Sequence, residues 1–395
     1  MKRACATLLA GFLLIVTMNA LADGSADVRA KKHILIYTPH RVMTAEERAR
    51  AATQAATGQT IPLWTYSFRA YDGNTYSGSM VGRAPFAHGH RTTVVPTYVI
   101  PVVLTFADTG TVFDPTQPDS CAPNSESVVN LILQSPLFQN TAFTINGVDV
   151  GTTQYLDAFQ RSNFWTYVVG TPYHSVFSTS PTVLPAVQVT VPTTEGSTAV
   201  NGFCAYGLMD IDWWDSLVQT QIIPGLAARG VGPANFPQFL FDSVFMYENH
   251  DPNQCCVLGY HNSMQNNGLF QTYSVNDYDT SGAIGEDTSV MSHELAEWLD
   301  DPNGLNPVPQ WGDMGQVPAG SCQNNLEVGD PMSPGGVSAT NPYSIAMPNG
   351  VTYTLQELAY FSWFYGGSSL GAGGFYSDHA TLKGYAKPCP PGGTN

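Results

Sequence analysis

The segment 292–302, which reads SHELAEWLDDP, constrains the fold more than any other part of the chain. Leu295 and Trp298 recur on one face of a helix, whereas His293 and Glu297 are four residues apart and project together from a different face. Asp-Pro-Asn-Gly at 301–304 ends the run. The pattern predicts a helix over 288–300 that buries one side and carries ionisable groups on the other.

The polar face of this helix has the spacing of a metal site. An imidazole and a carboxylate one helical turn apart can hold one cation. Glu294 lies between them and could take a proton from water at that cation, as the glutamate does in the zinc motif H-E-x-x-H. No lysine or arginine is near, and a buried acidic face is costly unless it is paired or metal-bound. We therefore expect a cation; the alternative is a solvated helix face backed by a buried tryptophan.

The N-terminus has the three parts of a secretory signal peptide. Met1-Lys2-Arg3 precedes an apolar run, and Ala20-Leu21-Ala22 follows it, which predicts cleavage after Ala22 and a signal peptide over 1–22. No later apolar run is long enough to span a bilayer. We expect a secreted protein, extracellular or periplasmic, that has no membrane contact after signal removal; an uncleaved anchor is the alternative.

The charge balance excludes one class of partner. The chain has 15 Lys and Arg against 31 Asp and Glu, a formal net charge of -16, and loss of Lys2 and Arg3 makes it -18 because 13 bases then face 31 acids. Between Thr92 and Leu382 the only bases are Arg161 and Arg229. Such a surface repels a phosphate backbone, so we expect no nucleic-acid binding.

A change of pattern near residue 97 divides the chain. Residues 23–96 are polar and mixed, with a capping box at Thr44 and Glu47, and predict an N-terminal extension that could serve as a pro-segment or linker. Residues 97–395 alternate runs of β-branched residues with fewer helices, which predicts a single β-rich α+β domain. The expected strands are 98–106, 142–150, 165–169, 182–191, 239–247 and 257–260, and the expected helices are 44–57, 125–134, 153–163, 208–226, 288–300 and 355–364.

Cysteine usage predicts disulfide bonds. One of seven cysteines leaves with the signal peptide, and six are an even number in an oxidising compartment. Their spacing does not choose among the fifteen connectivities. We expect Cys255 and Cys256 to bond to different partners, since a ring between neighbours would be strained. The six are Cys121, Cys204, Cys255, Cys256, Cys322 and Cys389.

Several further polar residues could complete a metal site. A catalytic zinc site needs three protein ligands and an open position. His293 and Glu297 supply two, and the spacing leaves the third open. A strand-like run ends at Tyr260 and His261, where the imidazole could be a ligand and the phenol could donate a hydrogen bond to an oxyanion. The other candidate ligands are Asp301, Glu327 and Asp330.

A second candidate cation site consists of Asp277, Asp279 and Ser281. With Gly282 they match the first half of an EF-hand calcium loop, but the twelfth position is Thr288 and not the bidentate glutamate that such a loop needs. We interpret the segment first as a turn and second as a Ca²⁺ site.

Several short motifs occur in one order over residues 240 to 365. They are Gly259-Tyr260-His261, Ser292-His-Glu-Leu-Ala-Glu297 with Asp301-Pro302, Trp311-x-Asp313, Glu327-x-x-Asp330 and Leu355-Gln356-Glu357. Together they resemble the C-terminal half of the phosphate-induced, Exordium-type extracellular proteins and their bacterial relatives. The resemblance implies a secreted protein with a zincin-like metal helix. Carried over by position, it marks His293, Glu294, Glu297, Asp301, Glu327 and Asp330.

The resemblance also orders the candidates for the third ligand: Glu327 comes first, with Asp330, Asp301 and His261 behind it. This sequence departs from the plant pattern in its N-terminal extension and in the Cys255-Cys256 pair.

We conclude from the sequence that the chain has a zincin-like α+β domain with a mixed β-sheet and a central metal-binding helix. The expected function is a secreted Zn²⁺-dependent hydrolase, a peptidase acting on extracellular protein or cell-wall substrate. His293, Glu297 and Glu327 would bind the cation, and Glu294 would accept the proton. The alternative is a non-enzymatic extracellular protein with a structural cation that binds cell-wall glycan or protein. The sequence does not indicate an oligomeric state.

Overall fold

The structure, a computed structural model, describes residues 44–87, 92–178, 180–285, 287–311, 322–332, 343–386 and 388. The expected signal peptide, the first part of the expected extension, Asp313 and Cys389 lie outside these residues.

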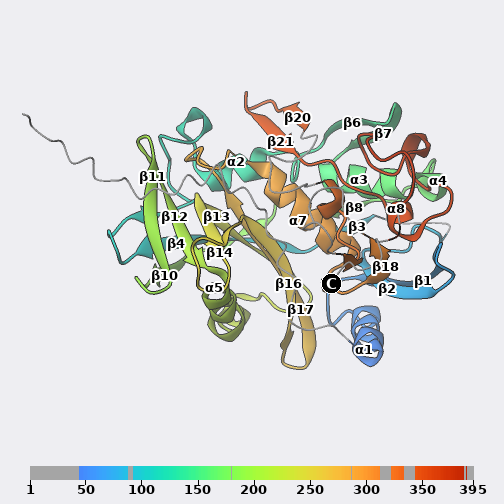
Figure 1. Cartoon of the computed structure of the whole chain (residues 1–395), viewed down its shortest axis with the longest axis horizontal. Coiled ribbons are helices and arrows are strands. Elements are labelled where there is room, and N and C mark those ends of the chain that lie inside the picture. Colours follow the sequence, from blue (N-terminus) through green and yellow to red (C-terminus); the bar gives the residue numbers. More distant parts are fainter. Residues whose placement is uncertain are drawn as a thin grey trace, which may run out of the picture.

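A mixed sheet of seven strands forms the centre of the molecule (Figure 1). Its main path runs β10-β4-β13-β17-β16. The first four of these strands pair in parallel, whereas β16 pairs with β17 antiparallel. The expected mixed sheet is therefore confirmed. The bounds are β4 Thr97–Phe106, β10 Val187–Val191, β13 Phe236–Asp242, β16 Gly259–Asn266 and β17 Leu269–Tyr278, with β5 Val112–Phe113 and β9 Thr182–Val183 beside β4.

The remaining strands form smaller sheets. A four-stranded sheet has the order β11-β12-β14-β15, from Gly196–Asn201, Cys204–Asp210, Val244–Tyr247 and Cys255–Val257. The two-stranded sheets are β1 with β2 (Leu63–Arg69, Thr75–Val81), β3 with β8 (Thr93–Val95, Ser175–Phe177), β6 with β7 (Thr141–Ile145, Val148–Thr153), β18 with β19 (Pro307–Trp311, Gln323–Asn325) and β20 with β21 (Tyr343–Ala346, Thr352–Leu355).

Helices are short, and the chain is a strand-rich α+β protein as expected. The α-helices of the described residues are α1 Ala45–Ala56, α2 Val128–Gln134, α3 Tyr155–Asn163, α4 Trp165–Val168, α5 Ile211–Leu217, α6 Ile223–Leu226, α7 Thr288–Asp300 and α8 Phe361–Tyr365. None of the helices in the described part of the chain is long and apolar enough to cross a membrane.

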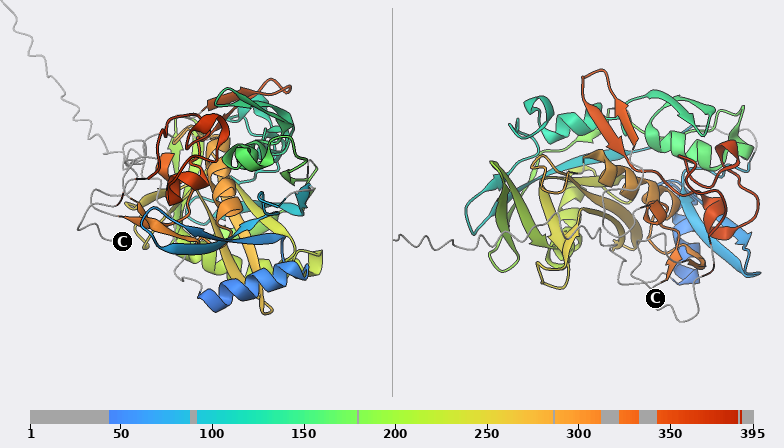
Figure 2. Two further views of the ribbon diagram at one scale, coloured as in Figure 1. Left: turned by 90° about the vertical axis from the view of Figure 1, so that its right-hand side faces the viewer. Right: turned by 45° about the horizontal axis from the view of Figure 1, so that its top comes forward.

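The α7 helix lies in the interior, and its expected bounds are confirmed. The Asp287 carboxylate accepts a hydrogen bond from the Thr288 backbone N–H and so caps its first turn. Every residue from Thr288 to Asp300 is buried. In Figure 2, left, α7 (orange) lies among the C-terminal segment (red), α3 (green) and the β1–β2 hairpin (blue), and it contacts each of them. The alternative of a solvated helix face is therefore wrong.

The two faces of the central sheet bury different elements. Leu240 of β13 belongs to the same core as Trp298 of α7, whereas its neighbours Phe239 and Phe241 pack with Trp214 of α5. Successive residues of a strand point to opposite faces, so α7 and α5 cover opposite sides of the sheet. A side chain at Gly259 of β16 would collide with α7, which shows how closely this helix approaches the strand.

The N-terminal hairpin is joined to the region of α7. The side chain of Asn306 exchanges two hydrogen bonds with the backbone of Ser79 in β2, at 3.0 Å and 2.7 Å. The hydroxyls of Tyr66 in β1 and Tyr365 in α8 are 2.7 Å apart. Residues 44–87 thus share a core with the rest of the chain, while removal of residues 23–96 as a pro-segment stays a prediction.

Some expected elements are wrong. Trp165–Val168 is helical and not a strand, because it continues directly from α3 through Phe164, whose backbone N–H bonds to Gln160. Cys204–Asp210 is a strand, so the helix expected over 208–226 begins only at Ile211, where Asp210 caps it. Four expected strands are each divided into two: 142–150 by a turn, 239–247 by a bend, and 182–191 and 257–260 by short irregular stretches.

The disulfides correct one expectation. Cys121 is bonded to Cys204, and Cys322 is also disulfide-bonded. Cys255 and Cys256 are bonded to each other, so the expectation that they take different partners is wrong. Their peptide bond is cis, which brings the two Cα atoms to 3.0 Å.

Candidate metal centre

His293 and Glu297 form the first part of the site, and both project from the same side of α7. Nε2 of His293 lies 3.1 Å from Oε1 of Glu297. Nδ1 of the same ring faces the amide oxygen of Gln356 at 3.1 Å, so it is the nitrogen that carries the proton in a neutral ring. This leaves Nε2 as the ligand atom.

The segment that follows β19 brings two more carboxylates. Oδ1 of Asp330 lies 3.5 Å from Nε2 of His293. Oε1 of Glu327 accepts a hydrogen bond from the Asn325 amide at 2.7 Å, while its buried Oε2 has no hydrogen-bond partner. The structure thus places Asp330, and not Glu327, in the trio with His293 and Glu297.

His261 enters from the central sheet. Strand β16 runs beneath α7, and Nδ1 of His261 lies 3.4 Å from Oε2 of Glu294 and 3.8 Å from Oε2 of Glu297. Its Nε2 faces the backbone carbonyl of Asp301 at 3.1 Å. His261 is therefore brought to the site, on the other side of Glu297 from His293.

Possible ligand atoms within 4.8 Å of one another define three groups among the described residues. Two of them share Glu297: one is His293, Glu297 and Asp330, and the other is His261, Glu294 and Glu297. All of these residues are at most 7% exposed. The third group is Glu195, Asp210 and His250, of which His250 is exposed.

Protonation shows how strongly these groups interact. Burial by itself lowers the pKa of His293, but the charge of Glu297 and the hydrogen bonds to Asp330 and Glu297 outweigh it and raise that pKa well above its usual value. For His261 the same balance of burial against Glu294 and Glu297 also raises the pKa. Burial raises the pKa of Glu327 well above its usual value, and the neighbouring carboxylates raise it further. Without a cation the cluster retains protons, which a bound metal ion would displace.

Two other predicted site residues have different roles. Asp301 accepts hydrogen bonds from the backbone N–H groups of Leu305 and Asn306 at 2.8 Å and 2.7 Å, and so closes the turn after α7. Tyr260 precedes His261 in β16 and therefore points to the opposite face, where its hydroxyl donates to Asp215 at 2.9 Å. The structure does not bring Tyr260 to the cluster.

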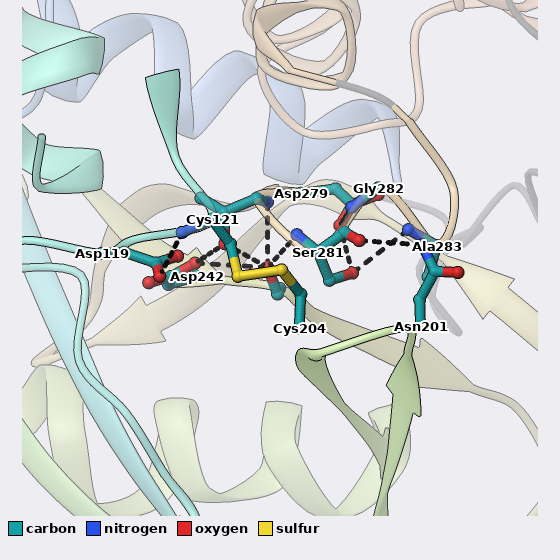
Figure 3. The surroundings of a disulfide bond; sticks show 11 residues. Asp119, Cys121, Asn201, Cys204, Asp242, Asp279, Ser281, Gly282 and Ala283 are labelled. Atoms are coloured by element: carbon teal, nitrogen blue, oxygen red, sulfur yellow. Dashed lines mark hydrogen bonds between the residues drawn. A yellow bond between two sulfur atoms is a disulfide. The ribbon is translucent and has the colours of Figure 1, made fainter. Parts of the chain in front are cut away.

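The expected calcium segment begins in β17 with Asp277, and from Asp279 onwards it forms a turn beside the Cys121–Cys204 disulfide (Figure 3). The Asp279 carboxylate accepts hydrogen bonds from Ser281, Gly282, Ile284 and Gly285. Asp277 accepts one from the Val244 backbone at 2.8 Å. The interpretation as a turn is therefore confirmed for the residues from Asp279 onwards, and Ca²⁺ binding at the segment stays a prediction.

Gly329 and Gln356 belong to the site, although the sequence analysis did not predict them as site residues. The backbone N–H of Gly329 donates to Oε1 of Glu297 at 3.1 Å, and its carbonyl accepts from the Gln356 amide at 2.6 Å. A side chain at Gly329 would collide with the His293 ring. The only signal in the sequence was their position within the motifs 327–330 and 355–357.

We expect Gly329→Ala to weaken zinc binding by about 10-fold to 100-fold, the usual effect of disturbing the groups that orient a ligand. The added methyl group must displace the His293 ring. Competition with a chromophoric chelator measures the affinity. Gly232→Ala is the matched control, since a side chain there meets no atom within 4 Å. Equal affinities in the two variants would contradict this placement of His293.

Comparisons with protein-family models, with curated proteins and with solved structures found no match to this chain. The resemblance to Exordium-type proteins therefore stays a prediction based on the motifs alone.

Proposed function

We propose that the chain is a secreted, zincin-like metallopeptidase in which His293, Glu297 and Asp330 hold a Zn²⁺ ion. One observation carries the proposal: an imidazole and a carboxylate one turn apart on a buried helix meet a carboxylate from a distant segment, at 3.1 Å and 3.5 Å. Imidazole and carboxylate are the ligand types of catalytic zinc sites. The disulfides support secretion, since they persist in oxidising compartments.

In the proposed hydrolysis, different residues of the chain would have different roles. Bound zinc would supply Lewis acidity for a carbonyl and for water. Glu294 follows His293 directly and lies among the same buried groups, so it would accept the proton of the attacking water. The Gln356 amide would hold the His293 ring in the tautomer that binds through Nε2. Two carboxylate ligands weaken the Lewis acidity of the ion, so a low turnover is expected.

Digestion of casein by purified protein tests the proposal. Glu294→Gln is expected to reduce kcat/KM by roughly 100-fold to 10,000-fold, the contribution of a general base. A chelator is expected to abolish cleavage. His250→Ala is a control because this exposed histidine belongs to a different group of possible ligands. Cleavage that survives both the chelator and Glu294→Gln would refute the enzyme.

The burial of all the candidate ligands favours a second candidate function, a structural cation in a non-enzymatic extracellular protein that binds cell-wall glycan or protein. Here chelation would unfold the protein, and the cation-loaded protein would not cleave casein. Elemental analysis of wild type against His293→Ala tests both functions at once. Equal metal contents would rule out His293 as a ligand.

A further inference from the structure

We propose that this centre holds two divalent cations bridged by the Glu297 carboxylate, with the second cation bound by His261 and Glu294. The first cation is the one assigned to His293, Glu297 and Asp330, so this inference rests on the proposed function. Glu294 faces the second position through Oε2. Its Oε1 is then the oxygen that accepts the proton in the proposed reaction.

The first argument is the position of Glu297 between two imidazoles. Its Oε1 lies 3.1 Å from Nε2 of His293, and its Oε2 lies 3.8 Å from Nδ1 of His261. The two imidazoles belong to different groups of ligand atoms, and Glu297 belongs to both. A carboxylate that offers one oxygen to each side suits a pair of ions roughly 3.5–4 Å apart, the usual spacing in two-metal sites.

The second argument is the orientation of both rings. His293 turns Nδ1 to the amide oxygen of Gln356, and His261 turns Nε2 to the carbonyl of Asp301. A histidine that binds a metal commonly donates its other N–H to such an acceptor. In each ring the remaining nitrogen faces Glu297. The chain therefore orients two imidazoles as ligands, on opposite sides of one carboxylate.

The third argument is charge. Glu294, Glu297, Glu327 and Asp330 are buried side by side and carry four negative charges when ionised. The two arginines between Thr92 and Leu382 are engaged elsewhere: Arg161 donates to the carbonyls of Val150 and Tyr173, and Arg229 to that of Pro185. Two divalent cations balance the four charges without any bound proton, whereas with one cation the other two charges need protons that stay on the cluster.

Glu327 lies beside the second position and not in it. Its Oε2 is 3.8 Å from Nε2 of His261, the nitrogen that faces the Asp301 carbonyl, and Glu327 belongs to neither group of ligand atoms. Ligand sets of one imidazole with carboxylate oxygens suit Zn²⁺ and Mn²⁺.

Metal stoichiometry tests the inference. Protein is loaded with Zn²⁺, passed over a chelating resin to remove loosely bound ions, and analysed for zinc per chain. We expect two ions in wild type and one in each of His261→Ala and His293→Ala. His250→Ala should retain two, which excludes the group at Glu195 and Asp210 as the second position. Circular dichroism and thermal unfolding identify any variant that has lost its fold, and His261→Gln replaces His261→Ala in that case.

Loading with Mn²⁺ supplies a second readout, because two bridged Mn²⁺ ions are spin-coupled. Wild type should give a coupled electron paramagnetic resonance spectrum, and each histidine variant should give the six-line spectrum of an isolated ion. One ion in wild type, retained in His261→Ala and lost in His293→Ala, would overturn this inference and leave the proposed function intact. No retained ion in wild type would overturn both.

Discussion

We expect chelation of the purified protein to lower its free energy of unfolding by about 4 kcal/mol relative to protein held at a free Zn²⁺ concentration of roughly 1,000 times the dissociation constant. The reason is linkage: the proposed ligands come from α7, β16 and the segment 322–332, and only the folded chain brings them together. At roughly 2.1 cal/mol/K per residue, the unfolding entropy of a chain of this length is about 0.8 kcal/mol/K, so the midpoint should fall by about 5 °C.

Thermal unfolding with and without chelator, followed by circular dichroism, measures this effect. Glu297→Ala is the sharpest control, because Glu297 belongs to both groups of ligand atoms and its loss should make the midpoint insensitive to the chelator. His250→Ala should respond as wild type does. An unchanged midpoint in chelated wild type would mean that the cluster binds no stabilising ion.

Trp298→Ala is expected to destabilise the protein by about 3–5 kcal/mol, the cost of deleting a fully buried large aromatic side chain. Trp298 has no solvent exposure, and its ring stacks on Phe236 of β13 with centroids 3.6 Å apart and planes 14° apart. Phe177 lies beside it at 6.0 Å. The tryptophan thus packs α7 against the central sheet.

Trp298→Phe separates packing from hydrogen bonding in this prediction. The indole N–H is buried without a hydrogen-bond partner, so its removal relieves a polar atom that is costly to bury. We expect Trp298→Phe to lose less than half of the stability lost by Trp298→Ala. Denaturant titration gives both values. A loss below about 1 kcal/mol in Trp298→Ala would show that the stacked ring does not hold the helix.

The elements that sequence reasoning located correctly depend on local interactions. The capping box of Thr44 and Glu47 starts α1 as expected, because both of its hydrogen bonds join residues three apart. Asp287 and the turn at Asp301 bound α7 in the same local way. The short helix at Trp165–Val168 was mistaken for a strand because four residues have no distinctive periodicity, and only its continuation from α3 decides its conformation.

In the candidate site, too, the pair related by local spacing was predicted, and tertiary contacts decided which other residues join it. Its first pair, His293 and Glu297, follows from helical spacing alone. The expectation that a cation neutralises them follows from the lack of lysine and arginine near them in the sequence. The choice of Asp330 over Glu327 depended on which way a loop between strands turns its side chains. The orphaned Oε2 of Glu327 depended on its burial.

Sequence by itself determined the central helix, its bounds and the imidazole and carboxylate that it presents, because a helix sets the relation of residues one turn apart through its own hydrogen bonds. Tertiary structure alone decided that His261 faces Glu297 and that Tyr260 does not. It also decided that Gly329 leaves room for the His293 ring, and that Cys255 bonds to Cys256. Contacts between residues far apart in the chain depend on how the sheet and loops pack, and no local pattern encodes that packing.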